Sequence, residues 1–322
     1  MGEDGWGGFG APWRPSGPPR TGVEAPRLTQ RMPVISGREF LRGDAPKVVD
    51  ARLLRYASDV VDCVIDELPA PWEIDHAARL ADVREFARST APDQMVPPPE
   101  EIPGLIDHTL LRPDARDAEV ERLCDEARAH GFASVCVLPR FVPLAALVLR
   151  RSRVRVGTVI GFPLGAAATL VKAVEAAIAV DQGARELDMV LAIGALKSGA
   201  LGDVGLDIAT VVRVAHAGEA LVKVILETAL LSDEEQVRAC LLARDAGADF
   251  VKTSTGYGLP GADERDVRRL RALVAPTMGV KAAGGIRTRA DLERMVRAGA
   301  TRIGTNSSVK MMQEYLTART AP

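Results

Sequence analysis

The sequence is poor in the residues that build metal centres, disulfide frameworks and membrane spans. It has four cysteines in 322 residues, with no C-x-x-C pair, and four histidines without metal-ligand spacing. We therefore predict neither a disulfide framework nor a bound metal. No apolar run approaches the roughly 18 residues of a membrane helix, so no membrane span is expected.

The charge is almost balanced, which excludes a further class of partners. The chain carries 41 basic and 43 acidic residues, for a net charge of -2. This gives no basic field to attract nucleic acid, and no nucleic-acid partner is predicted. The first residues lack the apolar run of a secretory signal, and with the sparse cysteines this favours a cytoplasmic protein.

Lysine is the third scarce residue. Only seven of the 41 basic residues are lysines, and the other 34 are arginines. Since arginine meets most needs for positive charge here, a lysine inside an apolar strand suggests chemistry that needs a primary amine. Lys47 and Lys172 are instead expected to be ordinary surface charges.

The first hundred residues differ from the rest in composition and in hydrophobic pattern. Residues 1–22 contain seven glycines and four prolines, so we predict a disordered tail over residues 1–30. Apolar spacing predicts helices over residues 58–68 and 72–86, and a proline-rich linker follows at residues 96–100. Residues 31–100 are thus expected to form a helical extension, and residues 101–322 the main domain.

From Gly104 onward, short apolar runs alternate with longer helical stretches. Eight strands separated by helices indicate a closed parallel sheet, a (β/α)₈ TIM barrel of the α/β class. Four glycines that each separate a predicted helix from a predicted strand repeat at intervals that fit units of about 28 residues, as such a barrel requires (Gly131, Gly183, Gly247 and Gly299). The predicted strands are 105–108, 134–138, 154–160, 186–190, 221–226, 249–252, 279–281 and 302–304.

Charged residues interrupt or end four of these strands. Lys223, Lys252, Lys281 and Asp188 all stand in or at the end of apolar runs, and TIM barrels carry their active sites at strand C-termini. One such lysine could equally form a buried ion pair, but three converging lysines are hard to explain as structure alone. Burial and a neighbouring cation lower the pKa of a lysine, and a neutral amine attacks carbonyl groups. The pattern predicts Schiff-base chemistry.

Glycine-rich loops follow the last two predicted strands. Gly284 and Gly285 come after the seventh strand, and Gly304 and its successors come after the eighth. Loops at these places in TIM barrels often bind phosphate through backbone N–H groups and a helix N-terminus. Arg287 could add a charged contact. The expected substrate is therefore a phosphorylated carbonyl compound.

Several segments together resemble deoxyribose-phosphate aldolases. They are Leu105-Ile-Asp-His-Thr-Leu-Leu-Arg-Pro-Asp114, Phe250-Val-Lys-Thr-Ser-Thr-Gly256 and Val280-Lys-Ala-Ala-Gly-Gly-Ile-Arg-Thr288, with further similarity over residues 133–141, 156–165 and 223–228. The resemblance covers about residues 102–315. It implies a class I aldolase, a lyase that reversibly cleaves 2-deoxy-D-ribose 5-phosphate into D-glyceraldehyde 3-phosphate and acetaldehyde. It further implies no metal or organic cofactor, and a homodimer.

The same resemblance implies roles for individual residues. Lys252 matches the Schiff-base lysine, Lys281 the second lysine that lowers its pKa, and Asp188 the acid/base carboxylate, acting through a bound water. The remaining matches bind substrate: Asp107, Thr109 and Lys223 around the hydroxyls and proton relay, Cys136 nearby, and Gly284, Gly285, Arg287, Gly304, Asn306 and Ser307 in the phosphate pocket. For Cys136, a small core residue is the favoured interpretation.

Two alternatives remain open from the sequence. One is another Schiff-base barrel aldolase acting on a keto substrate. The other is a phosphate-binding barrel without catalysis, serving as a scaffold. The presence of Lys252, Lys281 and Asp188 together argues against the second.

Overall fold

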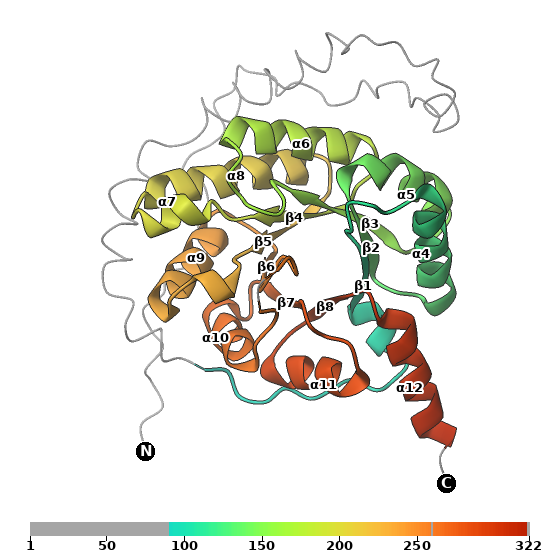
Figure 1. Ribbon diagram of the computed structural model, residues 1–322. Helices are drawn as coiled ribbons and strands as arrows, with labels where there is room; N and C mark the ends of the chain where they lie inside the picture. Colours follow the sequence, from blue (N-terminus) through green and yellow to red (C-terminus); the bar gives the residue numbers. More distant parts are fainter. Residues whose placement is uncertain (1–89, 259, 321–322) are drawn as a thin grey trace, which may run out of the picture.

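Eight short runs rich in Val, Ile and Leu form the parallel strands of a closed barrel (Figure 1). The computed structural model describes residues 90–258 and 260–320. The strands pair in chain order, and β1 closes the barrel against β8. The predicted TIM barrel is confirmed, with every predicted strand within two residues of an observed one. The strands are β1 (Ile106–Leu110), β2 (Ser134–Val137), β3 (Arg155–Ile160), β4 (Glu186–Val190), β5 (Leu221–Ile225), β6 (Phe250–Lys252), β7 (Gly279–Ala283) and β8 (Arg302–Thr305).

Helices between the strands form an outer ring around this barrel (Figure 1). A short 3-10 helix, η3 (Ile102–Leu105), precedes β1, and η4 (Pro139–Phe141) and η5 (Thr228–Leu230) follow β2 and β5. The α-helices are α4 (Asp117–His130), α5 (Val142–Leu149), α6 (Thr169–Asp181), α7 (Ile193–Lys197), α8 (Leu201–Ala217), α9 (Asp233–Asp245), α10 (Glu264–Val274), α11 (Arg289–Ala298) and α12 (Ser308–Thr320).

Local sequence signals explain where several helices begin and end. Ser232 and Thr288 each accept a hydrogen bond from the backbone N–H three residues later, in the capping boxes that start α9 and α11. At the other end, Gly131 and Gly299 adopt φ angles of 72° and 113°. Residues with a Cβ rarely reach these left-handed angles, so glycine is suited to ending α4 and α11 there.

Alternation along the strands separates an apolar outer core from a charged interior. Leu187 and Met189 of β4 are buried in the core cluster that joins the sheet to the helices. Their neighbours Glu186 and Asp188 are equally buried but point the opposite way, into the barrel. The centre of this barrel is therefore filled by charged groups, where Val, Ile and Leu are usual.

Lys172 is buried, so the prediction that it is a surface charge was wrong. It lies on α6, and its Nζ donates to the Val190 carbonyl at 3.0 Å and pairs with Asp207 of α8 at 2.5 Å. Its stem passes over Gly161, where an added Cβ would lie 2.8 Å from Lys172 Cε. The long chain thus carries the ammonium inward to the end of β4. Lys47, the tail 1–30 and the helices expected at 58–68 and 72–86 lie outside the described residues.

The segment before the barrel runs along α10 and α11 (Figure 1). Ala91 N–H donates to the Arg268 carbonyl at 3.1 Å, and Gln94 N–H donates to the Arg297 carbonyl at 2.8 Å. Asp93 also forms an ion pair with the Arg268 side chain. These contacts attach residues 91–94 to the outside of the helical ring.

Candidate active site

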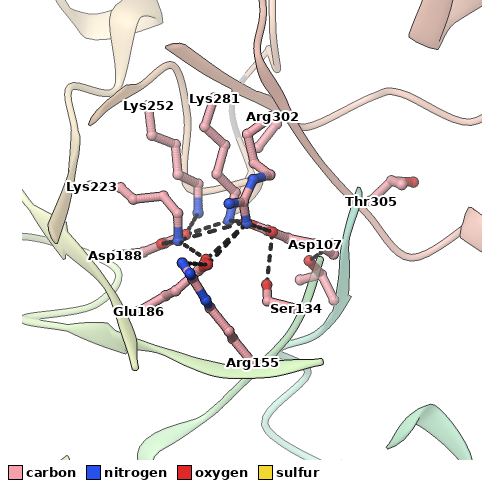
Figure 2. Close-up of polar contacts among 12 residues, drawn as sticks. Asp107, Ser134, Arg155, Glu186, Asp188, Lys223, Lys252, Lys281, Arg302 and Thr305 are labelled. Atoms are coloured by element: carbon pink, nitrogen blue, oxygen red, sulfur yellow. Dashed lines mark hydrogen bonds and ion pairs between the residues drawn. The ribbon is translucent and has the colours of Figure 1, made fainter. Parts of the chain in front are cut away.

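Three lysines from neighbouring strands meet at one carboxylate inside the barrel (Figure 2). Asp188 Oδ2 lies 2.8 Å from Lys252 Nζ and 2.7 Å from Lys281 Nζ, and Asp188 Oδ1 lies 2.8 Å from Lys223 Nζ. The four residues are at most 2% exposed. The structure therefore brings together the four charged residues that the strand pattern singled out.

A second group of buried charges extends this cluster toward β1 and β8. Asp107 Oδ2 lies 2.6 Å from Lys281 Nζ, and Asp107 Oδ1 accepts from Arg302 at 2.6 Å and from Ser134 Oγ at 2.7 Å. Arg302 also contacts both oxygens of Glu186, at 3.1 and 2.9 Å, and Glu186 Oε2 lies 2.7 Å from Lys223 Nζ. The interior thus forms one connected network.

Glu186, Ser134 and Arg302 were not predicted from the sequence. The period-2 alternation of Glu-Leu-Asp in β4 could have identified Glu186, since it must share the inward face with Asp188. Arg302 gives no such signal, because it begins a strand in a chain that is full of arginines. Only the pairing of Lys281 with Arg302 across β7 and β8 places it in the site.

The numbers of buried positive and negative groups in this network differ by one. Lys223, Lys252, Lys281 and Arg302 face three carboxylates, those of Asp107, Glu186 and Asp188. Uncompensated buried charge is costly, so one basic group is favoured to be neutral. Arg302 is not a candidate, because a guanidinium keeps its proton in proteins.

Geometry and electrostatics single out Lys252 as the basic group that is least held in its protonated form. Lys223 and Lys281 each contact two carboxylates within 3 Å, whereas Lys252 contacts only Asp188, at an oxygen it shares with Lys281. Burial and the Lys281 ammonium lower the pKa of Lys252 despite the attraction of Asp188. Burial also acts to lower the pKa of Lys281, but Asp107 and Asp188 outweigh it and raise that pKa.

The carboxylate at the centre stays ionised. Burial acts to raise the pKa of Asp188, but Lys223, Lys252 and Lys281 together hold it well below its ordinary value. Nearby on β2, burial raises the pKa of the Cys136 thiol, which is therefore protonated at neutral pH. Cys136 also packs with Leu111 and Val159 in a small apolar cluster. The site thus pairs an amine of lowered pKa with an ionised carboxylate.

The loops after β7 and β8 lie beside each other at the mouth of the barrel. Thr305 Oγ1 donates to the Ile286 carbonyl at 2.7 Å and ties the two loops together. Gly285 is exposed, with a φ of 78°, and a Cβ added there would lie more than 4 Å from any surrounding atom. Ser307 is half-buried and immediately precedes α12. Gly285 and Ser307 are therefore at least partly open to solvent, and the Ser307 N–H already donates to Thr305 Oγ1 at 3.0 Å.

Not every residue predicted for phosphate is exposed. Gly304 is buried, and a Cβ there would lie 2.9 Å from Lys281 Cε, so this glycine makes room for the lysine. Gly284 packs against the Gly261 backbone, and its carbonyl accepts from Ala262 N–H at 3.0 Å. The two other predicted phosphate residues, Arg287 and Asn306, are exposed.

Further residues at the mouth were not predicted. Tyr257, after β6, donates its hydroxyl to the Leu111 carbonyl at 2.7 Å and meets Phe162 edge-on at 5.2 Å. Glu227 is buried after β5 and accepts the Thr255 N–H at 3.0 Å. These contacts fix the loop that follows Lys252.

Thr109, which was predicted to bind substrate, is half-buried on β1, and its hydroxyl donates to the Asp107 carbonyl at 2.8 Å.

Two other kinds of site are absent from the described residues. Within residues 90–258 and 260–320, no group of three His, Cys, Asp or Glu side chains is placed to hold a metal ion. No helix in this part of the chain is long and apolar enough to cross a membrane.

Comparison with known proteins gives one consistent result. Residues 104–309 match the family model of DeoC/LacD family aldolases. The deoxyribose-phosphate aldolase of Carboxydothermus hydrogenoformans is 54% identical over 214 residues, which cover 66% of this chain and 94% of the relative. That of Thermococcus kodakarensis is 55% identical over 215 residues, covering 66% and 96%. A tetrameric deoxyribose phosphate aldolase from Aeropyrum pernix superimposes with a TM-score of 0.65 at 39% identity, over 69% of this chain and 93% of that one.

Proposed function

The chain belongs to the DeoC/LacD family of aldolases, and from this premise we propose that it reversibly cleaves 2-deoxy-D-ribose 5-phosphate into D-glyceraldehyde 3-phosphate and acetaldehyde. One observation carries the proposal for this chain: Lys252 is the least compensated of four basic groups that share three buried carboxylates. A neutral, buried amine is the nucleophile that a Schiff-base aldolase requires.

The proposed reaction begins at the Lys252 amine. It attacks the C1 carbonyl of the open-chain sugar, and loss of water gives an iminium ion. Removal of the proton from the C3 hydroxyl then breaks the C2–C3 bond, whose electron pair moves toward the iminium nitrogen. Glyceraldehyde 3-phosphate leaves, and the enamine takes up a proton at C2. Hydrolysis releases acetaldehyde and restores the amine.

We propose that Asp188 and Lys281 carry out the proton transfers of these steps. Asp188 Oδ2 contacts both Lys252 and Lys281, so a proton can pass between the two amines through this carboxylate. We assign Asp188 as the acid/base group, with a water molecule extending its reach to the substrate carbon. Lys281 serves as a proton donor and as the cation that keeps Lys252 neutral. Lys223 extends the relay from the other oxygen of Asp188.

Substrate binding is assigned to the mouth of the barrel. We propose that Thr109 contacts the sugar hydroxyls, whereas Asp107 acts through Lys281 because its oxygens are already engaged. The phosphate is assigned to the backbone of Gly284 and Gly285 and to Ser307 at the start of α12, where helix N–H groups favour an anion. Arg287 and Asn306 add side-chain donors at the rim.

A coupled assay tests the proposed function. Deoxyribose 5-phosphate is added to the enzyme, and the triose phosphate product is reduced by an auxiliary dehydrogenase while NADH consumption is followed. We expect turnover by the wild-type chain and none by Lys252→Leu. If the wild-type protein released no triose phosphate but still formed a reducible adduct with aldehydes, another Schiff-base aldolase activity would replace this one.

The cellular compartment, the oligomeric state and the domain boundaries are proposed on separate grounds. Cys124, Cys136 and Cys240 are free and buried, which fits a reducing, cytoplasmic environment. We propose self-association as a homodimer, and the relative from Aeropyrum pernix is a tetramer. We also propose that the catalytic domain spans residues 101–322, preceded by an extension that takes no part in the chemistry.

A further inference from the structure

Arg302 lies in the interior network without reaching the reacting amine. Its Nη1 contacts Asp107 Oδ1 at 2.6 Å and both oxygens of Glu186, and its guanidinium lies over the Phe250 ring at 5.5 Å. Within the described part of the chain, it is connected to Lys252 through Asp107, Lys281 and Asp188 in turn. A direct role in bond making is therefore excluded by its position.

The charge balance nevertheless depends on this arginine. With Arg302 present, the positive charges of Arg302, Lys223 and Lys281 match the three carboxylates, and the fourth basic group is in excess. Without Arg302, the three lysines alone would face Asp107, Glu186 and Asp188. All three lysines would then be held in the protonated form, Lys252 included.

We propose that Arg302 is a positioning residue that fixes the charge of the barrel interior, so that the amine of Lys252 stays neutral. The inference rests on the proposed Schiff-base function and extends it to a residue that touches neither substrate nor nucleophile. Arginine suits this position because its guanidinium bridges two carboxylates and never becomes the group that loses its proton. A lysine would offer only a point charge.

The charged groups around Lys252 come from several strands. Asp188 of β4 contacts Lys252 directly, and Lys281 of β7 contacts the same Asp188 oxygen. Lys223 of β5 contacts the other oxygen of Asp188. The Cys136 thiol of β2 is also close enough to affect the titration of Lys252. Arg302 contacts Asp107 and Glu186, and Glu186 Oε1 in turn lies 3.5 Å from Arg155 Nη1.

Arg155 does not alter this balance, and it provides a matched control. Its side chain is 52% exposed, so solvent screens its charge, whereas the Arg302 side chain is 11% exposed. Both arginines contact Glu186. Only the enclosed one should therefore affect the charge of Lys252.

The titration of Lys252 tests the proposal directly. Acetaldehyde and cyanoborohydride trap the neutral amine as an ethyl adduct, and mass spectrometry of the digested protein gives the trapping rate at Lys252 from about pH 5 to about pH 10. In Arg302→Met, the pH midpoint of trapping should move toward alkaline pH, with a rate at pH 7 about tenfold below wild type that recovers at high pH. Arg302→Lys should give a midpoint between those of Arg302→Met and wild type, because a lysine at this position can itself lose its proton. Arg155→Met should keep the wild-type midpoint.

Two further variants keep the test decisive if Arg302→Met folds poorly. Glu186→Gln removes one negative charge and should move the midpoint toward acid pH. Glu186→Gln combined with Arg302→Met removes one charge of each sign and should return the midpoint to the wild-type value. An unchanged midpoint in Glu186→Gln, or an equal alkaline shift in Arg155→Met, would overturn the proposal.

This measurement is independent of the sugar phosphate. A wild-type protein that cleaved no deoxyribose 5-phosphate, yet showed the predicted midpoints at Lys252, would overturn the proposed function and support the role of Arg302. If the wild-type protein cleaved deoxyribose 5-phosphate but Arg302→Met and Glu186→Gln left the midpoint unshifted, the proposed function would be supported and the role of Arg302 overturned.

Discussion

At the level of single residues, Lys252 is the proposed nucleophile and the first target for substitution. Trapping of substrate or acetaldehyde with borohydride should place the adduct on Lys252. Lys252→Leu should abolish both trapping and turnover, because the remaining amines of the site are held as ammonium ions by two or more carboxylates. Lys197→Leu, at an exposed surface pair with Glu235, is the matched control and should retain activity. An adduct on Lys223 or Lys281 would contradict the assignment.

The pH profile depends on Lys281. Its ammonium helps to lower the pKa of Lys252, together with burial and against the attraction of Asp188. In Lys281→Leu the pKa of Lys252 should rise, and the neutral amine becomes abundant only at higher pH. The acid limb of the kcat/KM profile should therefore shift toward alkaline pH while the maximum falls. A loss of activity with an unshifted limb would show that Lys281 acts only in proton transfer.

At the scale of single elements, the start of α12 is predicted to control affinity for phosphate. Ser307→Asp introduces a negative charge opposite a dianion, while an Asp before a helix N-terminus is compatible with folding. KM for deoxyribose 5-phosphate should rise by about tenfold or more, and kinetics with unphosphorylated deoxyribose should change little. Ser307→Ala serves as the control for loss of the hydroxyl alone. Equal losses on both substrates would locate the phosphate elsewhere.

Helices α6 and α8 are joined to the end of β4 by the buried pair Lys172–Asp207. Lys172→Met would leave the Asp207 carboxylate buried and the Val190 carbonyl without its donor. We expect a loss of about 3–5 kcal/mol in the free energy of unfolding, measured by urea denaturation. Burial raises the pKa of Asp207 even beside this lysine, so the ion pair is costly to enclose. Lys172→Met with Asp207→Leu should therefore recover part of the loss.

For the molecule as a whole, we expect the segment that precedes the barrel to contribute stability without taking part in the chemistry. It forms two backbone hydrogen bonds and one ion pair to α10 and α11, and Arg297 lies in the last turn of α11, away from the mouth. A chain that begins at residue 102 should lose about 1–3 kcal/mol relative to one that begins at residue 90. Its kcat/KM at 25 °C should be unchanged. A loss of activity before any loss of folding would contradict this division.

The barrel, and the four charged residues that meet inside it, could be predicted from the sequence alone. Strand after strand shows an apolar run followed by a helix of suitable length, and the glycines and capping boxes define the ends of helices locally. Lys223, Lys252, Lys281 and Asp188 could be identified because each interrupts or ends an apolar strand. Local patterns suffice where the physical cause, such as side-chain alternation or helix capping, is itself local.

The identity of the charges that share the site, and of the lysine that has the fewest carboxylate partners, required the three-dimensional arrangement of the strands. Lys172 has the sequence environment of a surface residue, yet its long stem delivers the ammonium to a carboxylate on another helix. Arg302 is one of many arginines, and closure of the barrel places it between Asp107 and Glu186. The charge state of Lys252 depends on the number of carboxylates enclosed with it. That number follows from the pairing of distant strands, because electrostatic energies in a buried network depend on positions in space and not on order along the chain.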